Sequence, residues 1–268
     1  MPYRLLHSPI ENPLSMSMKQ TFNPVLPCLL SFLLLMSPIL QARNIKHKKP
    51  VFHKAKIESL KVKAFSKAFL EEADSLYNEI DLKSVGLSQQ AFEYALKGYT
   101  YLLEHHWLNR SEVISICDFS QSSREKRLYI VDLEQKKVLI NTYVAHGRRS
   151  GSEYARSFSN NPSSHKSSLG FYVTEKTYYG DHGLALKIHG LEKGINDRAC
   201  ARNIVVHGSD YVGSDFIKMN KFNGRSFGCP AVPSSDVNDV IDAIKDGSCL
   251  FIYYPTKKYI AKSKILNS

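Results

Sequence analysis

The stretch GRSFGCPAVP, from Gly224 to Pro233, places a cysteine between a glycine and a proline. A catalytic cysteine needs an exposed position, a base or field that favours the thiolate, and donors for a developing oxyanion. Gly228 permits tight backbone geometry before Cys229, and backbone N–H groups at such a turn can converge on an oxyanion. Pro230 has no N–H to contribute. Cys229 is therefore a candidate nucleophile, with half of a disulfide and a small buried hydrophobe as the alternatives.

A base for this cysteine has to be a histidine that the fold brings close to it. His207 follows the apolar run Ile204–Val206, which predicts a position at the end of a buried strand. Gly208 comes next and allows a sharp turn, and Cys229 lies 22 residues beyond His207. His189, in LKIHG, has a similar context and is the rival candidate.

Two helices and about seven strands must position these side chains. Apolar residues recur at spacings of three and four over residues 64–80, and again in a segment that begins after the predicted cap Ser88. This helical hairpin is too short to hold a core alone, so we expect it to pack on the strand-rich segment after it. Seven short runs rich in Val, Ile and Tyr predict strands: VISICDF, KRLYIVDLE, KVLINTYVAHG, SLGFYVTEK, LALKIHGL, RNIVVHGSD and CLFIYYP.

The connections between these elements include one long loop and one late helix. Residues 148–166 are polar and rich in Gly, Ser and Asn, and loops of this length in compact domains are often functional. A helix is predicted over residues 236–245, capped by Ser234 or Ser235. The pattern predicts a mainly β domain, a sandwich or barrel with a few helices, preceded by a helical hairpin.

The sequence of the N-terminal region indicates that the protein is exported, and it does not indicate a folded core in this region. Lys19 and the apolar run Leu29–Met36 resemble a secretory signal ending near Ala42, with a retained membrane anchor as the alternative. Residues 43–67 then hold nine of the basic residues and one Glu, in a chain whose net charge is +11. We interpret this basic linker as a solvated arm, or one attracted to an anionic envelope surface. No recognition motif for nucleic acid accompanies it, so we expect no nucleic-acid partner and membrane contact only through the leader or the arm.

Four cysteines remain beyond the leader, and none forms a CxxC pair. Cys117 and Cys249 lie in apolar runs and are expected to pack as small hydrophobes inside strands, whereas Cys200 is ambiguous. Disulfides among these three stay possible in an oxidising compartment. The spacing of the His, Asp and Cys residues fits no metal-binding motif, so we expect no metal and no cofactor.

The segments IVVHGSDYV and GRSFGCPAVP together resemble the murein L,D-transpeptidase catalytic-domain family (YkuD-like), in its divergent branch. His207 and Gly208 match the family's His-Gly pair, and Ser226, Gly228 and Cys229 match its Ser/Thr-x-Gly-Cys motif. Further blocks, including VAHGRRSG and SSLGFYVTEKTYYGDHG, fall in the family's order. The resemblance spans about Leu128–Val232 and does not reach the helical hairpin.

Two departures from the commoner family pattern accompany this resemblance. Phe227 stands where that pattern has a histidine, and Pro230 to Pro233 stand where it has an arginine after the cysteine. The resemblance implies catalytic roles for Cys229, His207, Ser226 and Gly228, with a backbone carbonyl orienting the histidine. Substrate contacts are expected from Arg225, Gly208, Phe227 and His146.

The implied reaction is cysteine acyl transfer on the stem peptides of peptidoglycan, with release of a terminal D-alanine and cross-linking to an acceptor amine. A carbapenem is expected to acylate the same cysteine, and the envelope or periplasm is the expected location. The alternatives are an L,D-carboxypeptidase or another wall-peptide hydrolase, and a non-catalytic envelope protein that binds peptidoglycan. The expected domains are a signal peptide (1–42), a basic linker (43–63), the hairpin (64–110), the catalytic domain (111–256) and a C-terminal tail (257–268).

Overall fold

The computed structural model describes residues 66–181 and 183–268 of the chain. The predicted signal peptide, residues 1–42, and the predicted basic linker, residues 43–63, lie outside these described residues. In the described part, no helix combines the length and apolar character that crossing a membrane requires.

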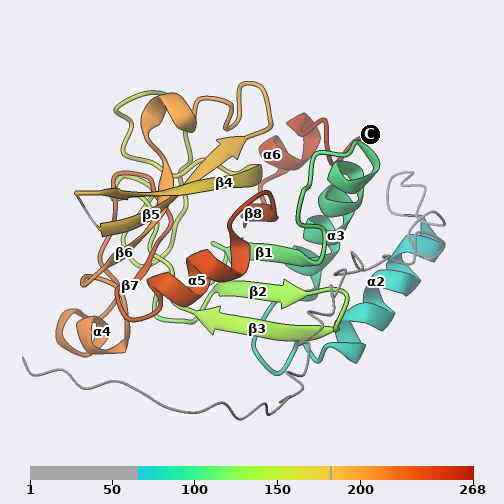
Figure 1. Cartoon of the computed structure of the whole chain (residues 1–268), viewed down its shortest axis with the longest axis horizontal. Helices are drawn as coiled ribbons and strands as arrows, with labels where there is room; N and C mark the ends of the chain where they lie inside the picture. Colours follow the sequence, from blue (N-terminus) through green and yellow to red (C-terminus); the bar gives the residue numbers. More distant parts are fainter. Residues whose placement is uncertain (1–65, 182) are drawn as a thin grey trace, which may run out of the picture. The chain divides into compact units, whose positions relative to one another are not determined.

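A mixed eight-stranded sheet is the centre of the fold (Figure 1). Its strands run in the order β3-β2-β1-β8-β4-β5-β6-β7, with parallel pairing between β1 and β8 and between β6 and β7. Their bounds are β1 Val113–Asp118, β2 Leu128–Asp132, β3 Lys137–Thr142, β4 Gly170–Gly180, β5 Gly183–Gly190, β6 Val205–Ser209, β7 Ala231–Pro233 and β8 Cys249–Tyr253. The seven predicted strands are present, and β7 is an eighth that the sequence did not indicate.

The two ends of the sheet meet and close it into a barrel. Just beyond β3, Ala145 pairs with Ala231 of β7, and its N–H donates to the Ala231 carbonyl oxygen at 2.8 Å. The Ser226 N–H donates to the His146 carbonyl oxygen at 3.0 Å, and the Arg148 N–H donates to the Ser226 carbonyl oxygen at 2.7 Å. This mainly β architecture with few helices confirms the predicted sandwich or barrel class of fold.

The predicted helical hairpin packs on this barrel. α2 spans Lys67–Glu79 and α3 spans Gln89–Glu104, and α3 lies against β1 and β8. The Ser88 hydroxyl accepts a hydrogen bond from the Ala91 N–H at 3.2 Å, so the predicted cap is confirmed. A Cβ on Gly98 would stand 1.9 Å from the Phe171 ring, so only glycine lets α3 approach the sheet this closely.

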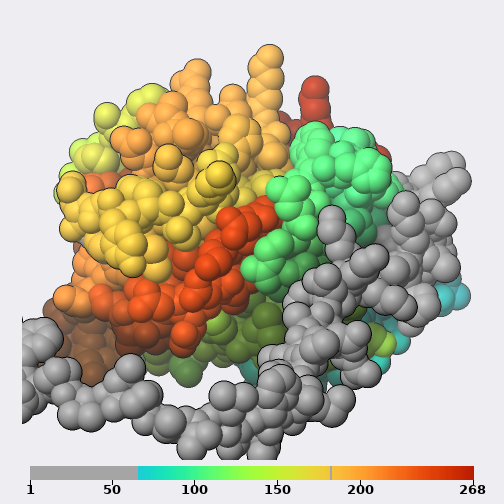
Figure 2. Space-filling model, viewed as in Figure 1, coloured from blue at the N-terminus to red at the C-terminus, as the bar shows by residue number. Residues whose placement is uncertain are grey.

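The late helix is also present, as α5 over Val237–Ile244, and it packs against β1, β2, β5 and β6. In Figure 2 the segment containing α5 runs across the visible face beside strands β4 and β5, drawn in yellow. Its N-cap position is Asp236 and no side chain caps it, so the predicted serine cap is wrong. Ser234 instead donates to Asp210, and Ser235 donates to the Asp236 carboxylate.

Three short helical elements were not predicted: η1 Cys200–Arg202, α4 Ser214–Asn220 and α6 Lys257–Lys262. α6 belongs to the segment expected to be a C-terminal tail, yet this segment packs onto the domain. Tyr259 and Ser263 both donate hydrogen bonds to the carboxylate of Glu192, which is buried, and the Phe171 N–H donates to it at 2.9 Å. Burial raises the pKa of Glu192, while these three donors oppose that effect.

Candidate active site around Cys229

Cys229 follows a turn whose shape requires glycine at position 228. Gly228 has φ +132°, a conformation that residues with a Cβ rarely adopt. A Cβ there would stand 2.8 Å from the carbonyl oxygen of Lys166 and 3.0 Å from Cδ1 of Ile204. The glycine therefore lets the turn pass between the 148–166 loop and the residue that precedes β6.

Ser226 holds this turn from the inside. Its buried hydroxyl accepts a hydrogen bond from the Gly228 N–H at 3.0 Å and donates one to the Cys229 carbonyl oxygen at 2.7 Å. The Gly228 amide, expected to bind an oxyanion, is thus already engaged in this conformation. Ser226 therefore shapes the turn. The Cys229 N–H interacts with the sulfur of the same residue, which lowers the pKa of the thiol and favours the thiolate.

The register of β6 and β7 brings the predicted nucleophile and base to one part of the sheet. His207 pairs with Ala231 in parallel, so Val205 and Cys229, each two residues earlier, lie side by side. The Val205 N–H donates to the Cys229 sulfur at 3.5 Å. Because side chains two apart on a strand share a face, His207 stands on the same face as Val205.

A backbone carbonyl orients the His207 ring. Nδ1 lies 2.9 Å from the Gly208 carbonyl oxygen, which can only accept, so Nδ1 carries the proton of the neutral ring. Nε2 is then the basic nitrogen. The side-chain position of Gly208 faces α5, since a Cβ placed there would stand 3.1 Å from Cβ of Val237. The Gly208 carbonyl orients the histidine, and the expected substrate contact of Gly208 stays a prediction.

Burial raises the pKa of the Cys229 thiol above its usual range. The Val205 N–H and the charge of Arg202 act in the opposite direction and favour the thiolate, without reversing the effect of burial. The thiol is half-buried and also donates to the Asn203 carbonyl oxygen at 3.6 Å. The resting cysteine is therefore a thiol, and it needs a base to become a nucleophile at neutral pH.

Arg202 is a site residue that the sequence did not reveal. Its guanidinium donates to the carbonyl oxygens of Ser159 at 2.9 Å and Lys166 at 2.5 Å, and to the hydroxyls of Ser164 and Ser168. One of its nitrogens, Nη2, lies 3.2 Å from the point where a Cβ on Gly228 would stand. Arg202 thus fixes the 148–166 loop beside the nucleophile turn, and the sequence signal for it was a basic residue three positions before the start of the His207 strand.

Phe227 is directed outward beside the cysteine, with 62% of its surface exposed. The Phe227 ring centroid lies 4.7 Å from the His165 ring centroid. The Arg148 guanidinium carbon lies 4.5 Å from the same Phe227 centroid. Arg148 Nη2 and His165 Nδ1 are 3.0 Å apart. Arg225 is exposed as well and donates to the Gly151 carbonyl oxygen at 3.1 Å. The long loop and the turn thus form a basic rim with one exposed aromatic ring.

Two predicted histidines do not belong to this site. His146 is fully buried, and its Nδ1 lies 2.8 Å from Nη2 of the buried Arg127. Burial and the Arg127 charge lower the pKa of His146 to about 3, so the ring is neutral. Its side chain has no exposed surface, so the expected substrate contact does not fit this conformation. His189 lies on β5 with 56% of its side chain exposed and faces Glu175 of β4 at 3.8 Å. His207 is therefore the better candidate for the base.

The four described cysteines are free thiols. Cys117 and Cys249 are buried in β1 and β8, which confirms their packing as small hydrophobes, and burial raises the pKa of Cys117 to about 12. Cys200 is exposed. Over residues 66–181 and 183–268, no three His, Cys, Asp or Glu side chains gather where they could hold a metal ion.

Comparisons with known proteins agree with this architecture. The family model for the L,D-transpeptidase catalytic domain matches residues 83–253. This match is longer than the expected Leu128–Val232 and includes α3, so the family likeness does reach the helical hairpin. No curated protein sequence matches the chain.

Several solved structures resemble the chain. An L,D-transpeptidase from Mycobacterium smegmatis is 10% identical over 53% of this chain and 59% of its own, with a TM-score of 0.33. An L,D-transpeptidase solved in complex with imipenem is 11% identical with the same coverage and TM-score. The helical cell shape determining protein Pgp2 from Campylobacter jejuni is 14% identical over 65% of this chain and 61% of its own, with a TM-score of 0.37. The chain thus spans less than two thirds of the length of these structures.

Proposed function

The chain belongs to the L,D-transpeptidase catalytic domain family, and on that premise we propose that it transfers acyl groups between stem peptides of peptidoglycan through Cys229. One observation carries the proposal. A glycine-dependent turn presents the Cys229 sulfur to the Val205 N–H, beside the strand that holds the oriented His207. Covalent catalysis needs a nucleophile, a base that deprotonates it and a group that orients the base; here these are Cys229, His207 and the Gly208 carbonyl.

The first half-reaction forms a thioester. Nε2 of His207 takes the thiol proton, and the sulfur attacks the carbonyl carbon of the residue before a terminal D-alanine. The tetrahedral oxyanion then collapses, the C–N bond breaks, and the imidazolium donates its proton to the departing amine of D-alanine. We assign stabilisation of the oxyanion to the Cys229 N–H, because Ser226 already engages the Gly228 N–H, and one such donor contributes about 3 kcal/mol.

The second half-reaction resolves the thioester. The amine of a neighbouring stem peptide attacks the acyl carbon, His207 accepts the amine proton, and the C–S bond breaks to regenerate the thiol. Water as the nucleophile would give a carboxylic acid, and the protein would then act as an L,D-carboxypeptidase. The basic rim of Arg148 and Arg225 suits the carboxylates that stem peptides carry.

The location and the inhibitor class belong to the same proposal. Peptidoglycan lies outside the cytoplasmic membrane, so the protein is secreted to the envelope or periplasm, as its leader sequence predicts. Imipenem is bound by one of the related proteins. We therefore expect a carbapenem to acylate Cys229 through opening of its β-lactam ring, with a mass increase on the peptide that holds this cysteine.

Muropeptide analysis with the purified full chain tests this function. Disaccharide tetrapeptides are incubated with the protein, and the products are separated by liquid chromatography and identified by mass. Dimers with loss of D-alanine are expected from the unaltered protein and from Cys200→Ala, a control at an exposed cysteine, but not from Cys229→Ala. Tripeptides without dimers would identify a carboxypeptidase. Cross-linking by Cys229→Ala would overturn the role of the cysteine, and no product from any form would favour a binding protein.

A further inference from the structure

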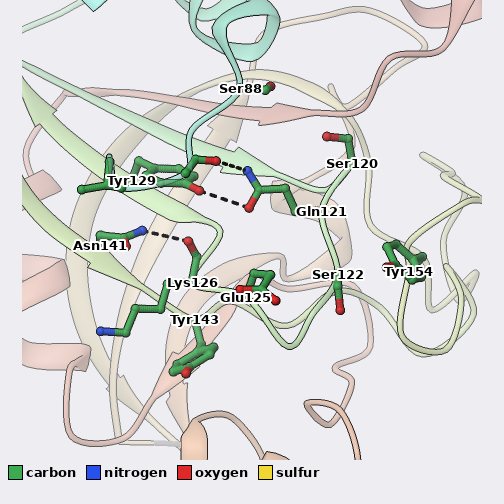
Figure 3. Close-up of a pocket in the computed structure, with 12 residues that line it drawn as sticks. Ser88, Ser120, Gln121, Ser122, Glu125, Lys126, Tyr129, Asn141, Tyr143 and Tyr154 are labelled. Atoms are coloured by element: carbon green, nitrogen blue, oxygen red, sulfur yellow. Dashed lines mark hydrogen bonds between the residues drawn. The ribbon is translucent and has the colours of Figure 1, made fainter. Parts of the chain in front are cut away.

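A hollow of about 790 Å³ lies outside the Cys229 site, where the helical hairpin meets the barrel (Figure 3). It is bordered by the turn before α3, the loop between β1 and β2, strand β3 and the 148–166 loop. Its lining residues are Val85, Gly86, Ser88, Ser120, Gln121, Ser122, Glu125, Lys126, Tyr129, Asn141, Tyr143 and Tyr154. Neither Cys229 nor His207 is among them.

The lining of this hollow is polar but carries no net charge. Hydroxyls of serine and tyrosine and two side-chain amides predominate, and the single acid, Glu125, is balanced by the single base, Lys126. The rim of the Cys229 site, by contrast, is basic. A neutral ligand with many hydroxyl or amide groups therefore suits the hollow better than a phosphate, a nucleic acid or an acidic peptide.

Hydrogen bonds hold the polar side chains of the hollow in fixed positions. The Gln121 amide nitrogen donates to the Gly86 carbonyl oxygen at 2.8 Å, and its oxygen accepts from the Tyr129 hydroxyl at 3.1 Å. The Asn141 nitrogen donates to the Lys126 carbonyl oxygen at 2.8 Å. Among the described residues, no hydrogen-bond partner is found for Oδ1, the side-chain amide oxygen of Asn141. A preformed acceptor is thus ready for a ligand N–H or O–H.

Aromatic rings supply the apolar part of the surface. Tyr154 is 41% exposed, with the Arg156 guanidinium carbon 5.8 Å from its ring centroid, and Tyr143 is half-buried. Figure 3 shows Tyr154 on one side of the hollow, opposite Tyr129 and Asn141. An exposed ring facing fixed polar groups matches a sugar, whose C–H face packs on the ring while its hydroxyl and acetamido groups form hydrogen bonds.

The same loop borders both the hollow and the Cys229 site. Tyr154 belongs to the 148–166 loop, and the Gly151 carbonyl oxygen of that loop accepts a hydrogen bond from Arg225 beside the nucleophile turn. Further along this loop, His165 contacts Phe227. A long polymer could therefore occupy both places at once, with a neutral part in the hollow and an acidic part at the basic rim.

We propose that this hollow binds the glycan strand of peptidoglycan, as a subsite for neutral N-acetylhexosamine units. The choice of sugar rests on the proposed function, whereas the polar and aromatic lining that selects a neutral saccharide does not. Tyr154 packs against a sugar face, and Oδ1 of the Asn141 side chain accepts from an acetamido N–H. The bound strand positions its stem peptide toward the Cys229 turn.

Calorimetric titration with chitotetraose, a peptide-free oligomer of N-acetylglucosamine, tests this proposal on the full chain. The Cys229→Ala form is used, so that binding is measured without any reaction. Tyr154→Ala is expected to raise the Kd by about fivefold, the contribution of one aromatic contact. Tyr154→Phe keeps the ring and is expected to stay within about twofold. Tyr179→Ala, at a tyrosine that is 83% exposed on β4, is the matched control and should not change the Kd.

The results separate this proposal from the proposed enzyme activity. Absence of chitotetraose binding, or equal binding by Tyr154→Ala and the parent protein, would overturn the glycan subsite and leave the transferase proposal standing. Binding that depends on Tyr154 in a protein that forms no cross-links would support the subsite and contradict the transferase. Thermal unfolding of each variant shows that a weaker Kd does not come from loss of fold.

Discussion

Replacement of Arg202 by Gln tests whether a positive charge beside the nucleophile turn favours the Cys229 thiolate. Arg202 Nη2 lies 3.2 Å from the Cβ position of Gly228. Gly228 directly precedes Cys229 and the Arg202 charge favours the thiolate, so we take a separation of roughly 7 Å, about two residue lengths, for the calculation. At this distance, with an effective dielectric constant of about 40 for a half-exposed group, the charge stabilises the thiolate by about 1 kcal/mol.

Loss of this charge raises the pKa of Cys229 further, which has two opposing effects on reactivity. Well below the pKa, the thiolate fraction falls about fivefold for 1 kcal/mol. The remaining thiolate is more nucleophilic, by about twofold for a Brønsted slope near 0.45. Net alkylation at about pH 8 should therefore be two- to threefold slower, while well above the pKa it should be about twofold faster.

Iodoacetamide alkylation of Cys229, followed by mass spectrometry across the pH range, measures this effect without any substrate. The rate–pH curves of Arg202→Gln and the unaltered protein should cross. Arg202→Lys, which keeps the charge but not the fork of donors, should follow the unaltered curve, as should Arg198→Gln, which removes an exposed charge nearby in sequence. Curves for Arg202→Gln that lie uniformly lower at every pH would refute the electrostatic reasoning and assign Arg202 a structural role alone.

Three further predictions concern the nucleophile turn and the buried Glu192. Gly228→Ala forces a Cβ into a positive-φ position against the Lys166 carbonyl, and about 1–3 kcal/mol of stability should be lost, seen as a lower Tm. Ser226→Ala leaves the Gly228 N–H and the Cys229 carbonyl without their partner, so a Tm decrease corresponding to about 1–3 kcal/mol is expected; an unchanged Tm would show that the turn does not need the hydroxyl. Glu192 has a raised pKa in the folded chain, so the folded state holds its proton more tightly than the unfolded state does. The stability from this proton is fully present below the unfolded pKa and is lost as pH rises through the raised folded pKa. Glu192→Gln cannot lose a proton, so its Tm relative to the unaltered protein should increase with pH across that window, and parallel Tm curves would contradict the assignment.

Local sequence patterns predicted the elements whose signals lie within one segment. The seven predicted strands and the three predicted helices are present, because their apolar spacing is the spacing that buries them. β7 was missed because it has three residues and ends in Pro233, so it carries no periodicity of its own. α6 was missed because its burial depends on Glu192, whose partnership with Tyr259 and Ser263 comes from distant parts of the chain.

The site was predictable in part for the same reason. Cys229 and His207 stand in short motifs, and the strand register brings those motifs together. Arg202 escaped notice because its partners, the carbonyls of Ser159 and Lys166, are known only once the 148–166 loop has folded over it. His146 was predicted to contact substrate because it stands at the start of the polar loop in the sequence. In the structure it is buried and hydrogen-bonded to the buried Arg127, a partner 19 residues away that the sequence does not indicate.

The contact between Ala145 and Ala231 makes the nucleophile turn the seam of the barrel. Ser226, at the start of the turn, exchanges backbone hydrogen bonds with His146 and Arg148 across this seam, and Ala231 comes two residues after Cys229. These pairings join segments distant in sequence, so closing them costs more loop-closure entropy than forming the local hairpins. A chain with an open seam lacks the strand register that gives the sulfur its Val205 N–H and its neighbouring histidine. Closure of the seam therefore assembles the site, because the sulfur meets the Val205 N–H and the His207 strand only in the closed register.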